Sequence, residues 1–589
     1  MRFLALLGMT TVFATRETFR HKPVESPAPM TYPPAFVRMR AIVMALLAVL
    51  SLAAASYWVR LGVPAKMADA PTARIACVSY SPYRTPGESP FTKGTVVSQA
   101  RIAEDLAALS RRFDCVRTYS VGQGLAAVPA IAKQVGMKVL LGAWLLRDPV
   151  ENAEELALAI EVAKANRDTI RAIVVGNEVL LRGELPQRTL AEHVRAVRAA
   201  TGLPVTYADV WEFWLKYREV APAVDFITIH ILPYWEDEPV AIAGAIAHVR
   251  DIHAKMRAAF PGREFLIGET GWPSAGRQRW QAVPSRVNEA RFFREFLNFA
   301  GQTGLAYNVI EAFDQPWKRK LEGTVGGYWG LYDDDLNDKF PLTGPVVEEP
   351  RWAWGLAAGA GLAIVFVLAG WIATRLGSRS LAPMSWRAAG SVRALFGFFA
   401  GAVLAGQARH MVFANRDDVE WAVTGAMTLL ALATAWLASE RIAHWAAGER
   451  DRDALLANAP LARVFRLGAV PGRCLGALQA TWLFAATLVD LLLVFDSRYR
   501  DFPTLLFAPA VVGFVLLALA RRSTRVASNV EIEERLMAWW LVAASALIVA
   551  MELPINGSAV LWALACAAFS LSVLRERSSA PEPGPARRP

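Results

Sequence analysis

The placement of long apolar runs constrains this chain more than any other feature. One run, Ala41 to Trp58, is flanked by arginines. A second apolar region begins at Trp352 and continues almost to the C-terminus. An apolar run of about 18 residues or more is long enough to cross a bilayer as a helix. The hydrophobic share of 54%, against 20% charged residues, excludes a disordered chain and an ordinary soluble enzyme. We therefore expect a membrane protein with a polar segment between its first two spans.

The C-terminal region predicts seven further spans separated by short polar loops. They are Ala353 to Thr374, Ala394 to Ala414, Trp421 to Leu437, Leu475 to Phe495, Thr504 to Leu519, Met537 to Met551 and Ala559 to Leu574. Arg-rich loops alternate with Arg-poor loops, and by the positive-inside rule the Arg-rich ones are cytoplasmic. This places both chain ends inside and the polar segment outside. The net charge of +10 is therefore interpreted as a topology signal rather than a nucleic-acid surface.

These patterns divide the chain into five parts. We expect an N-terminal cytoplasmic leader (residues 1–40), a transmembrane anchor (41–60), an external polar domain (61–350), a multi-span helical membrane domain (351–575) and a disordered cytoplasmic tail (576–589). About forty mixed residues precede the first apolar run, which favours an uncleaved anchor over a cleaved signal peptide. Whether Met39 is the natural start stays open.

Two charged residues fall inside predicted spans, where a charge is costly and suggests a partner or a pathway. Arg409 in the third span and Asp490 in the fifth lie at similar predicted depth, so they could pair. The alternative is that Arg409 reaches the outer interface together with His410, and that Asp490 faces a water-filled crevice.

The four cysteines show no spacing typical of a zinc site or a disulfide scaffold. Cys77 and Cys115 could lie on neighbouring strands, but we expect buried free thiols.

The polar segment alternates short apolar runs with amphipathic helical patterns. The predicted strands are Arg74 to Tyr80, Cys115 to Val121, Lys138 to Trp144, Ile170 to Val179, Leu203 to Val210, Val224 to Leu232, Glu264 to Thr270 and Tyr307 to Phe313. Their nearly continuous Val/Ile/Leu character is typical of parallel strands covered on both faces. Eight such repeats without a Gly-rich phosphate loop predict the α/β class and a closed (β/α)8 TIM barrel. An obvious eighth helix is missing, because a Gly- and Asp-rich stretch follows Phe313.

Two glutamates end predicted strands of this barrel. Glu178 follows the fourth strand and Glu269 the seventh, and catalytic groups of such barrels lie at the carboxyl ends of strands. A single strand-end Glu is more often a helix cap or a surface ion pair. Two partly desolvated carboxyls facing one cleft can instead divide into an acid and a base, and strands four and seven can bring them to the roughly 5 to 5.5 Å that retaining glycosidases use.

The residues around these glutamates carry a family resemblance. Val-Gly-Asn-Glu at 175–178 and Glu-Thr-Gly-Trp-Pro-Ser-Ala-Gly at 269–276 resemble the two signature motifs of glycoside hydrolase family 17, the β-1,3-glucanase and glucanosyltransferase family. The resemblance covers roughly residues 74–340. Further support comes from Tyr80-Ser81-Pro82-Tyr83, Arg117-Thr118-Tyr119, Pro233-Tyr234-Trp235 and Phe313-Asp314-Gln315-Pro316-Trp317-Lys318.

The resemblance implies a role for each matched residue. Glu178 is the acid/base, Glu269 the nucleophile, and Asn177 orients the sugar. Arg117 holds a catalytic carboxylate or forms a structural ion pair. His230, on an apolar strand, is expected to be a core histidine, and the chemistry requires no metal and no cofactor. The candidate sugar-binding aromatics, each of which could equally be core, are Tyr80, Tyr234, Trp235, Trp272 and Trp317.

The resemblance also indicates a function for the whole chain. Family-17 domains fused to several spans resemble bacterial enzymes that remodel or branch periplasmic β-glucans with β-1,3 and β-1,6 linkages. We therefore expect a retaining glycosidase or transglycosylase in a bacterial inner membrane, with its barrel in the periplasm and no nucleic-acid partner. A glucan synthesis or export partner is left open. The alternatives are a non-catalytic glucan sensor and a component of a polysaccharide export or synthesis machine, although the spans lack the QxxRW signal of a processive glycosyltransferase.

Overall fold

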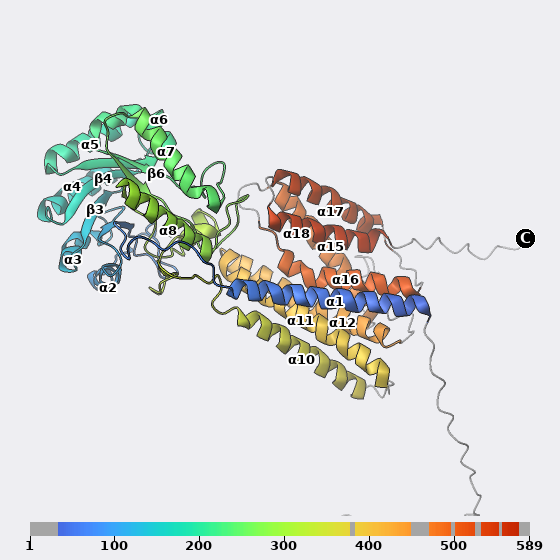
Figure 1. Ribbon diagram of the computed structural model, residues 1–589. Coiled ribbons are helices and arrows are strands. Elements are labelled where there is room, and N and C mark those ends of the chain that lie inside the picture. The colour runs from blue at the N-terminus through green and yellow to red at the C-terminus, as the bar shows by residue number, and fades with distance from the viewer. Residues whose placement is uncertain are drawn as a thin grey trace, which may run out of the picture.

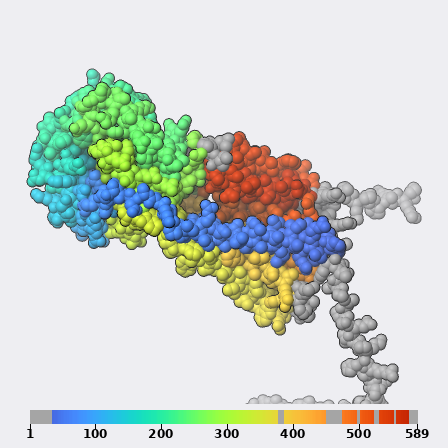
Figure 2. All heavy atoms as spheres, viewed as in Figure 1, coloured from blue at the N-terminus to red at the C-terminus, as the bar shows by residue number. Residues whose placement is uncertain are grey.

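The chain folds into a barrel of alternating strands and helices, followed by a bundle of long helices (Figure 1). The computed structural model describes residues 33–376, 383–448, 471–495, 501–524, 530, 532–552 and 556–575. Most of the expected N-terminal leader and the expected disordered tail at 576–589 lie outside these ranges. Figure 2 shows the barrel at one end of the bundle, with α1 running along the bundle surface as a continuous blue stripe.

The predicted (β/α)8 barrel is confirmed. Eight parallel strands pair in chain order from first to last. Backbone bonds between the region after the last strand and the first strand close the ring, since Ser79 N donates to Val309 O and Val309 N donates to Cys77 O at 2.9 and 3.0 Å. The strands are β1 (Val78–Ser79), β2 (Cys115–Arg117), β3 (Lys138–Ala143), β4 (Ile170–Asn177), β5 (Val205–Val210), β6 (Ile227–His230), β7 (Phe265–Glu269) and β8 (Ala306–Tyr307).

Amphipathic helices cover the outside of the strands. Ser98 and Ser285 cap two of them, because each side-chain oxygen accepts a backbone N–H of the first turn. The last of these helices buries Phe292, Phe293 and Phe296 against the barrel, as the spacing of the sequence predicts. The helices are α2 (Gln99–Leu109), α3 (Val128–Gln134), α4 (Pro149–Ala165), α5 (Gln187–Thr201), α6 (Trp211–Lys216), α7 (Ala245–Ala259) and α8 (Arg286–Thr303). Between β8 and the bundle lie only two short helical turns, α9 (Lys318–Leu321) and the 3-10 helix η4 (Thr324–Gly327), so the expected gap in the pattern is present.

Within the residues that the structure describes, eight helices are long and apolar enough to cross a membrane. Every predicted span lies within one of them, and most helices extend beyond the predicted span by several residues. They are α1 (Pro34–Gly62), α10 (Ala353–Leu376), α11 (Pro383–Ala414), α12 (Asp418–Ala446), α15 (Pro471–Phe495), α16 (Thr504–Thr524), α17 (Ile532–Met551) and α18 (Gly557–Leu574). Figure 1 shows α1 packed alongside α11 and α16, although the barrel separates it from them in sequence.

The suggested pairing of Arg409 with Asp490 is wrong. Arg409 Nε donates to Glu349 Oε2 at 2.8 Å, in the segment that joins the barrel to α10. Asp490 is fully buried, and its Oδ1 accepts the indole N–H of Trp562 at 2.6 Å. Counting residues along each helix predicts a similar depth for the two charges. Their side chains nevertheless lie on helix faces that contact different neighbours. His410 forms a separate pair with Asp501 at 2.9 Å.

The expectation of free thiols at Cys77 and Cys115 is also wrong, since the two residues form a disulfide. Cys115 begins β2, and Cys77 directly precedes β1. These strands are neighbours, paired through Val78 and Val116, so parallel register brings the two sulfurs together. Cys474 and Cys566 are free cysteines.

Candidate active site

Glu178 lies at a sharp turn that ends β4. Gly176 has a φ of +86° and Glu178 a φ of +52°, in the left-handed region that side chains other than glycine rarely adopt. A Cβ at Gly176 would come within 2.7 Å of Val179 Cγ2. The backbone N–H of Glu178 donates to Ala208 O on β5 at 2.8 Å, and this bond holds the turn. The strained turn presents the carboxyl at the barrel mouth, where 23% of the side chain is exposed.

Glu269 ends β7 and is more enclosed, with 6% of its side chain exposed. Arg117 from β2 donates to Glu269 Oε1 at 3.0 Å, and the hydroxyl of Tyr119 donates to the same oxygen at 2.8 Å. Burial and the negative charge of Glu269 raise the pKa of Tyr119 well above its usual value, so this hydroxyl keeps its proton. Among the described residues, none donates to Oε2. The arrangement fixes the carboxylate while leaving one oxygen available for attack.

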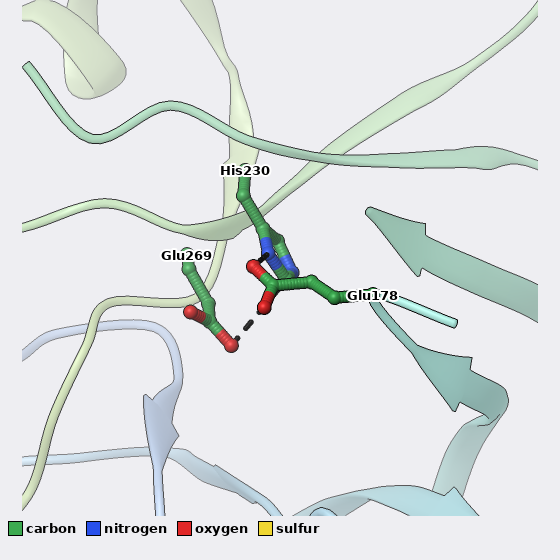
Figure 3. Close-up of side chains that lie close together, drawn as sticks. All are labelled: Glu178, His230 and Glu269. Atoms are coloured by element: carbon green, nitrogen blue, oxygen red, sulfur yellow. Dashed lines mark hydrogen bonds and ion pairs between the residues drawn. The ribbon is translucent and has the colours of Figure 1, made fainter. Parts of the chain in front are cut away.

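The two carboxyls face each other across the mouth, with His230 between them (Figure 3). One oxygen of Glu178, one of Glu269 and a ring nitrogen of His230 all lie within 4.8 Å of one another. His230 ends β6, with Nδ1 2.8 Å from Glu178 Oε1 and Nε2 3.7 Å from Glu269 Oε1. The histidine is buried, as expected, but it belongs to the site rather than to the apolar core.

His230 also sets the charge state of Glu178. Burial raises the pKa of the Glu178 carboxyl, but the hydrogen bond and charge of His230, together with Arg117 and Arg182, outweigh burial and lower that pKa below its usual value. In the unliganded chain Glu178 is therefore mostly ionised at neutral pH. Its protonated form is populated as the pH falls.

Asn177 precedes Glu178 and is also buried at the mouth. Its side-chain oxygen accepts a hydrogen bond from the guanidinium of Arg117, the same group that holds Glu269. The amide oxygen is thereby engaged, which assigns the amide orientation and leaves the NH₂ group as the donor for a ligand. Arg117 thus links the two motifs in one network.

The candidate aromatics divide into two groups. Tyr80 and Trp272 are fully buried: the Tyr80 hydroxyl donates to Asp105 at 3.0 Å, and Trp272 packs on Phe292. Tyr234 is also buried and contacts Trp329 in an edge-on arrangement. Two of the candidates remain partly exposed and able to meet a sugar, namely Trp235 and Trp317.

Sequence reasoning did not assign roles to Tyr119, His230 or a buried Glu311–Lys318 pair. Lys318 Nζ lies 2.8 Å from Glu311 Oε1, just beyond β8. Burial raises the pKa of Glu311 to about 7 although Lys318 opposes the shift. A usable signal existed for Tyr119, since it lies two residues beyond Arg117 and a strand places such residues on one face.

Glu178, His230 and Glu269 also offer three ligand atoms that could hold a metal ion. A cation bound to Glu269 Oε1 would compete with Arg117, which donates to that oxygen at 3.0 Å. Because the guanidinium charge lies beside this carboxylate, the donor set suits protonated and hydrogen-bonded partners better than a metal.

The barrel region is similar to domains of known proteins. The family model described as the BtgE/BtgC glycoside hydrolase domain matches residues 77–330. A glucan 1,3-beta-glucosidase of Saccharomyces cerevisiae is 26% identical over 272 residues, covering 42% of this chain and 87% of its own length. A glucan 1,3-beta-glucosidase of Schizosaccharomyces pombe is 28% identical over 259 residues, covering 40% of this chain and 79% of its own length.

A solved structure is also similar to part of this chain. An active-site mutant of the Rhizomucor miehei beta-1,3-glucanosyltransferase, in complex with laminaritriose, is 26% identical and covers 47% of this chain and 98% of that chain, with a TM-score of 0.40. Residues 77–330 are therefore similar to the BtgE/BtgC glycoside hydrolase domain and to glucan 1,3-beta-glucosidases, and the described part of the C-terminal region contains several long apolar helices.

Proposed function

We propose that this chain is a membrane-anchored enzyme that cleaves or transfers β-1,3-linked glucose units with retention of configuration. The observation that carries the proposal is the facing pair of carboxyls at the ends of β4 and β7, with oxygens within 4.8 Å of each other. Retaining glycosidases use a short carboxyl separation of this kind because one group attacks the anomeric carbon directly. The names of the curated relatives supply the substrate class, a 1,3-β-glucan.

In the first step, Glu269 Oε2 attacks the anomeric carbon while Glu178 donates its proton to the departing glycosidic oxygen. Arg117 and Tyr119 hold Glu269 Oε1, so the attacking oxygen is aimed and the carboxylate cannot rotate away. The NH₂ group of Asn177 is placed to donate to a sugar hydroxyl beside the reacting carbon. The step exchanges one C–O bond for another and leaves Glu178 ionised.

In the second step, Glu178 takes a proton from an incoming hydroxyl as that oxygen displaces Glu269. Water as the acceptor gives hydrolysis, and a glucan hydroxyl gives transfer. Trp235 and Trp317 are the partly exposed aromatic faces on which a glucose ring of donor or acceptor would pack.

The eight long apolar helices support the membrane part of the proposal. The carboxyl-terminal end of α11 contacts the barrel through Val412, whereas Arg393 lies nineteen residues earlier, about 28 Å away along the helix. The pair of Arg393 with Glu440 of α12 therefore marks the end of the bundle away from the barrel. Under the positive-inside rule, Arg-rich connections at that end favour a barrel on the periplasmic side.

The test is turnover of laminari-oligosaccharides by the full chain in detergent or lipid nanodiscs, with products identified. We expect shorter and longer glucans as hydrolysis and transfer compete, and no turnover by Glu269→Gln. Glu178→Gln should lose roughly 10²- to 10⁴-fold in rate, the usual worth of a positioned proton donor. Binding of the same glucans without any turnover would contradict the enzyme and favour a sensor.

A further inference from the structure

Two loops at the carboxyl end of the barrel contact the helical bundle. The loop after β8 does so through Tyr328, whose hydroxyl donates to the backbone carbonyl of Val412 at 3.0 Å. Val412 lies in the last turn of α11, where carbonyls have no partner within the helix and are free to accept. The Tyr328 ring contacts the Phe413 ring in an edge-on arrangement with ring centres 5.6 Å apart, and the guanidinium of Arg319 lies 4.4 Å from the Tyr328 ring centre. Tyr328 is therefore held by two contacts to its ring and by the hydrogen bond of its hydroxyl.

The loop after β7 makes a second contact and is tied to the first. Arg277 lies 3.8 Å from Glu420 in the first turn of α12, and both side chains are largely buried. Ser274 joins the two loops, because its backbone N–H and its hydroxyl both donate to the carbonyl of Tyr328 at 2.9 and 3.2 Å. The α11–α12 hairpin thus holds the loop that begins at Glu269 and the loop that follows β8. We call the side chains of Tyr328, Arg277, Phe413 and Glu420, together with the backbone carbonyl of Val412, the loop clamp.

The clamp continues directly into the aromatic wall of the site. Trp329, next to Tyr328, is buried and stacks on Trp235 with ring centres 6.3 Å apart and planes 13° apart. The backbone carbonyl of Trp329 accepts the N–H of Glu311 at 3.0 Å, which fixes Trp329 to the segment that follows β8. Tyr234 packs on the edge of Trp329, and its hydroxyl donates to the Arg277 carbonyl at 2.5 Å. A shift at Tyr328 would therefore be transmitted through Trp329 to Trp235.

We propose that the helical bundle is a working part of the catalytic cleft, and that Tyr328 is a positioning residue through which α11 holds Trp235 in place for glucan binding. The inference rests on the proposed glucan activity and assigns the bundle a task beyond anchoring. Side chains packed in this way have a few discrete arrangements rather than a continuous range, so loss of the clamp should change how well Trp235 meets a sugar. Neither Tyr328 nor Phe413 touches the two catalytic carboxyls, so the bond-breaking step should not change.

The experiment measures kcat and KM separately for laminaripentaose with the full chain in nanodiscs. Tyr328→Phe removes only the hydroxyl, and Phe413→Ala removes the ring that supports Tyr328. We expect each to raise KM roughly threefold to tenfold, the size of effect expected when an aromatic contact is misplaced, with kcat within about twofold of wild type. Because both act through one contact, the double variant should cost no more than the larger single change.

Two controls separate positioning from general destabilisation. Val412→Ala trims a half-exposed side chain but keeps the accepting carbonyl. Tyr307→Phe removes a hydroxyl that accepts the N–H of Ala76 at the opposite end of the barrel. Both should keep the wild-type KM.

If the wild-type chain is active and KM is unchanged in both Tyr328→Phe and Phe413→Ala, the inference is overturned. It is also overturned if the two increases in KM multiply in the double variant. Either result leaves the proposed function intact. A wild-type chain without turnover would overturn the proposed function and this inference together.

Discussion

Glu178 combines a strained backbone with neighbours that stabilise the ionised form of its carboxyl. Its φ of +52° is maintained by the bond to Ala208 O, and His230 lowers its pKa. A general acid must carry a proton when the substrate arrives, so this lowered pKa restricts the protonated, productive form of the unliganded enzyme to acidic pH. The enzyme should therefore lose kcat/KM as the pH rises from acid to neutral.

The His230→Gln variant tests that assignment. Glutamine can still donate to Glu178 but carries no charge, so the pKa of Glu178 should rise and the protonated fraction should persist to higher pH. We expect the alkaline limb of the kcat/KM profile to move up by about one pH unit or more. His248→Gln is the matched control, because His248 pairs with Glu236 at 2.9 Å, away from the catalytic carboxyls. A limb that stays in place or moves down would contradict the role given to His230.

Metal dependence is a second question at this scale. Since a cation on Glu269 Oε1 would compete with Arg117, we expect extensive dialysis against EDTA to leave kcat and KM for laminari-oligosaccharides within about twofold of the untreated chain. Loss of activity that added divalent cation restores would instead mean that Glu178, His230 and Glu269 hold a metal.

At the scale of elements, strand and helix order followed from the sequence, whereas strand ends did not. The eighth apolar run was predicted to continue to Phe313, but β8 ends at Tyr307. Asn308 follows directly, and its side-chain amide donates to Ser79 Oγ and Gly268 O at 2.8 and 2.7 Å, across to the neighbouring strands. Such bonds depend on closure of the barrel, which hydropathy does not encode.

The candidate site shows the same division. Glu178 and Glu269 could be predicted because each follows an apolar strand within a distinctive motif. The position of His230 could not, since an apolar strand carries it and its partners come from β4 and β7. Likewise, the sequence does not distinguish the buried ring of Tyr80 from the partly exposed ring of Trp235, because tertiary packing decides which face is covered.

The disulfide is a test at the element scale. β1 has only two strand residues, and the Cys77–Cys115 bond, spanning 38 residues of sequence, ties it to β2. Closing a loop of that length is worth about 4 kcal/mol by the chain-entropy estimate. We expect the Cys77→Ala/Cys115→Ala chain to exchange the amide hydrogens of β1 and β2 much faster than wild type. Cys566→Ala, which removes a free buried cysteine, should leave that exchange unchanged. Equal amide exchange in the wild type, the double cysteine variant and Cys566→Ala would show that the disulfide does not stabilise the pairing of β1 with β2.

At the scale of the whole molecule, the proposed function depends on the side of the membrane that the barrel occupies. Disulfides form in oxidising compartments, so the Cys77–Cys115 bond agrees with the periplasmic placement favoured by the Arg-rich connections. A topology reporter needs an insertion site away from the loop after β7, because the bundle holds that loop. Gly87 lies in an exposed loop with open space around it.

A reporter pair checks this topology. Alkaline phosphatase inserted at Gly87 should be active, whereas the same enzyme fused after Arg575 should be inactive. A green fluorescent protein should show the reverse, with fluorescence only after Arg575. The opposite pattern would place the barrel in the cytoplasm and remove it from any periplasmic glucan.

The central claim is that Glu269 forms a covalent bond to the sugar while Glu178 transfers the proton. The most direct measurement is trapping with a 2-deoxy-2-fluoro-β-laminaribiosyl donor that carries a good leaving group, followed by peptide mass spectrometry of the full chain. The account predicts the added mass on the peptide that contains Glu269, and its loss in Glu269→Gln. Glu178→Gln should still be labelled, because a good leaving group needs no proton. A label on any other residue, or no label on a chain that turns over laminari-oligosaccharides, would contradict the account.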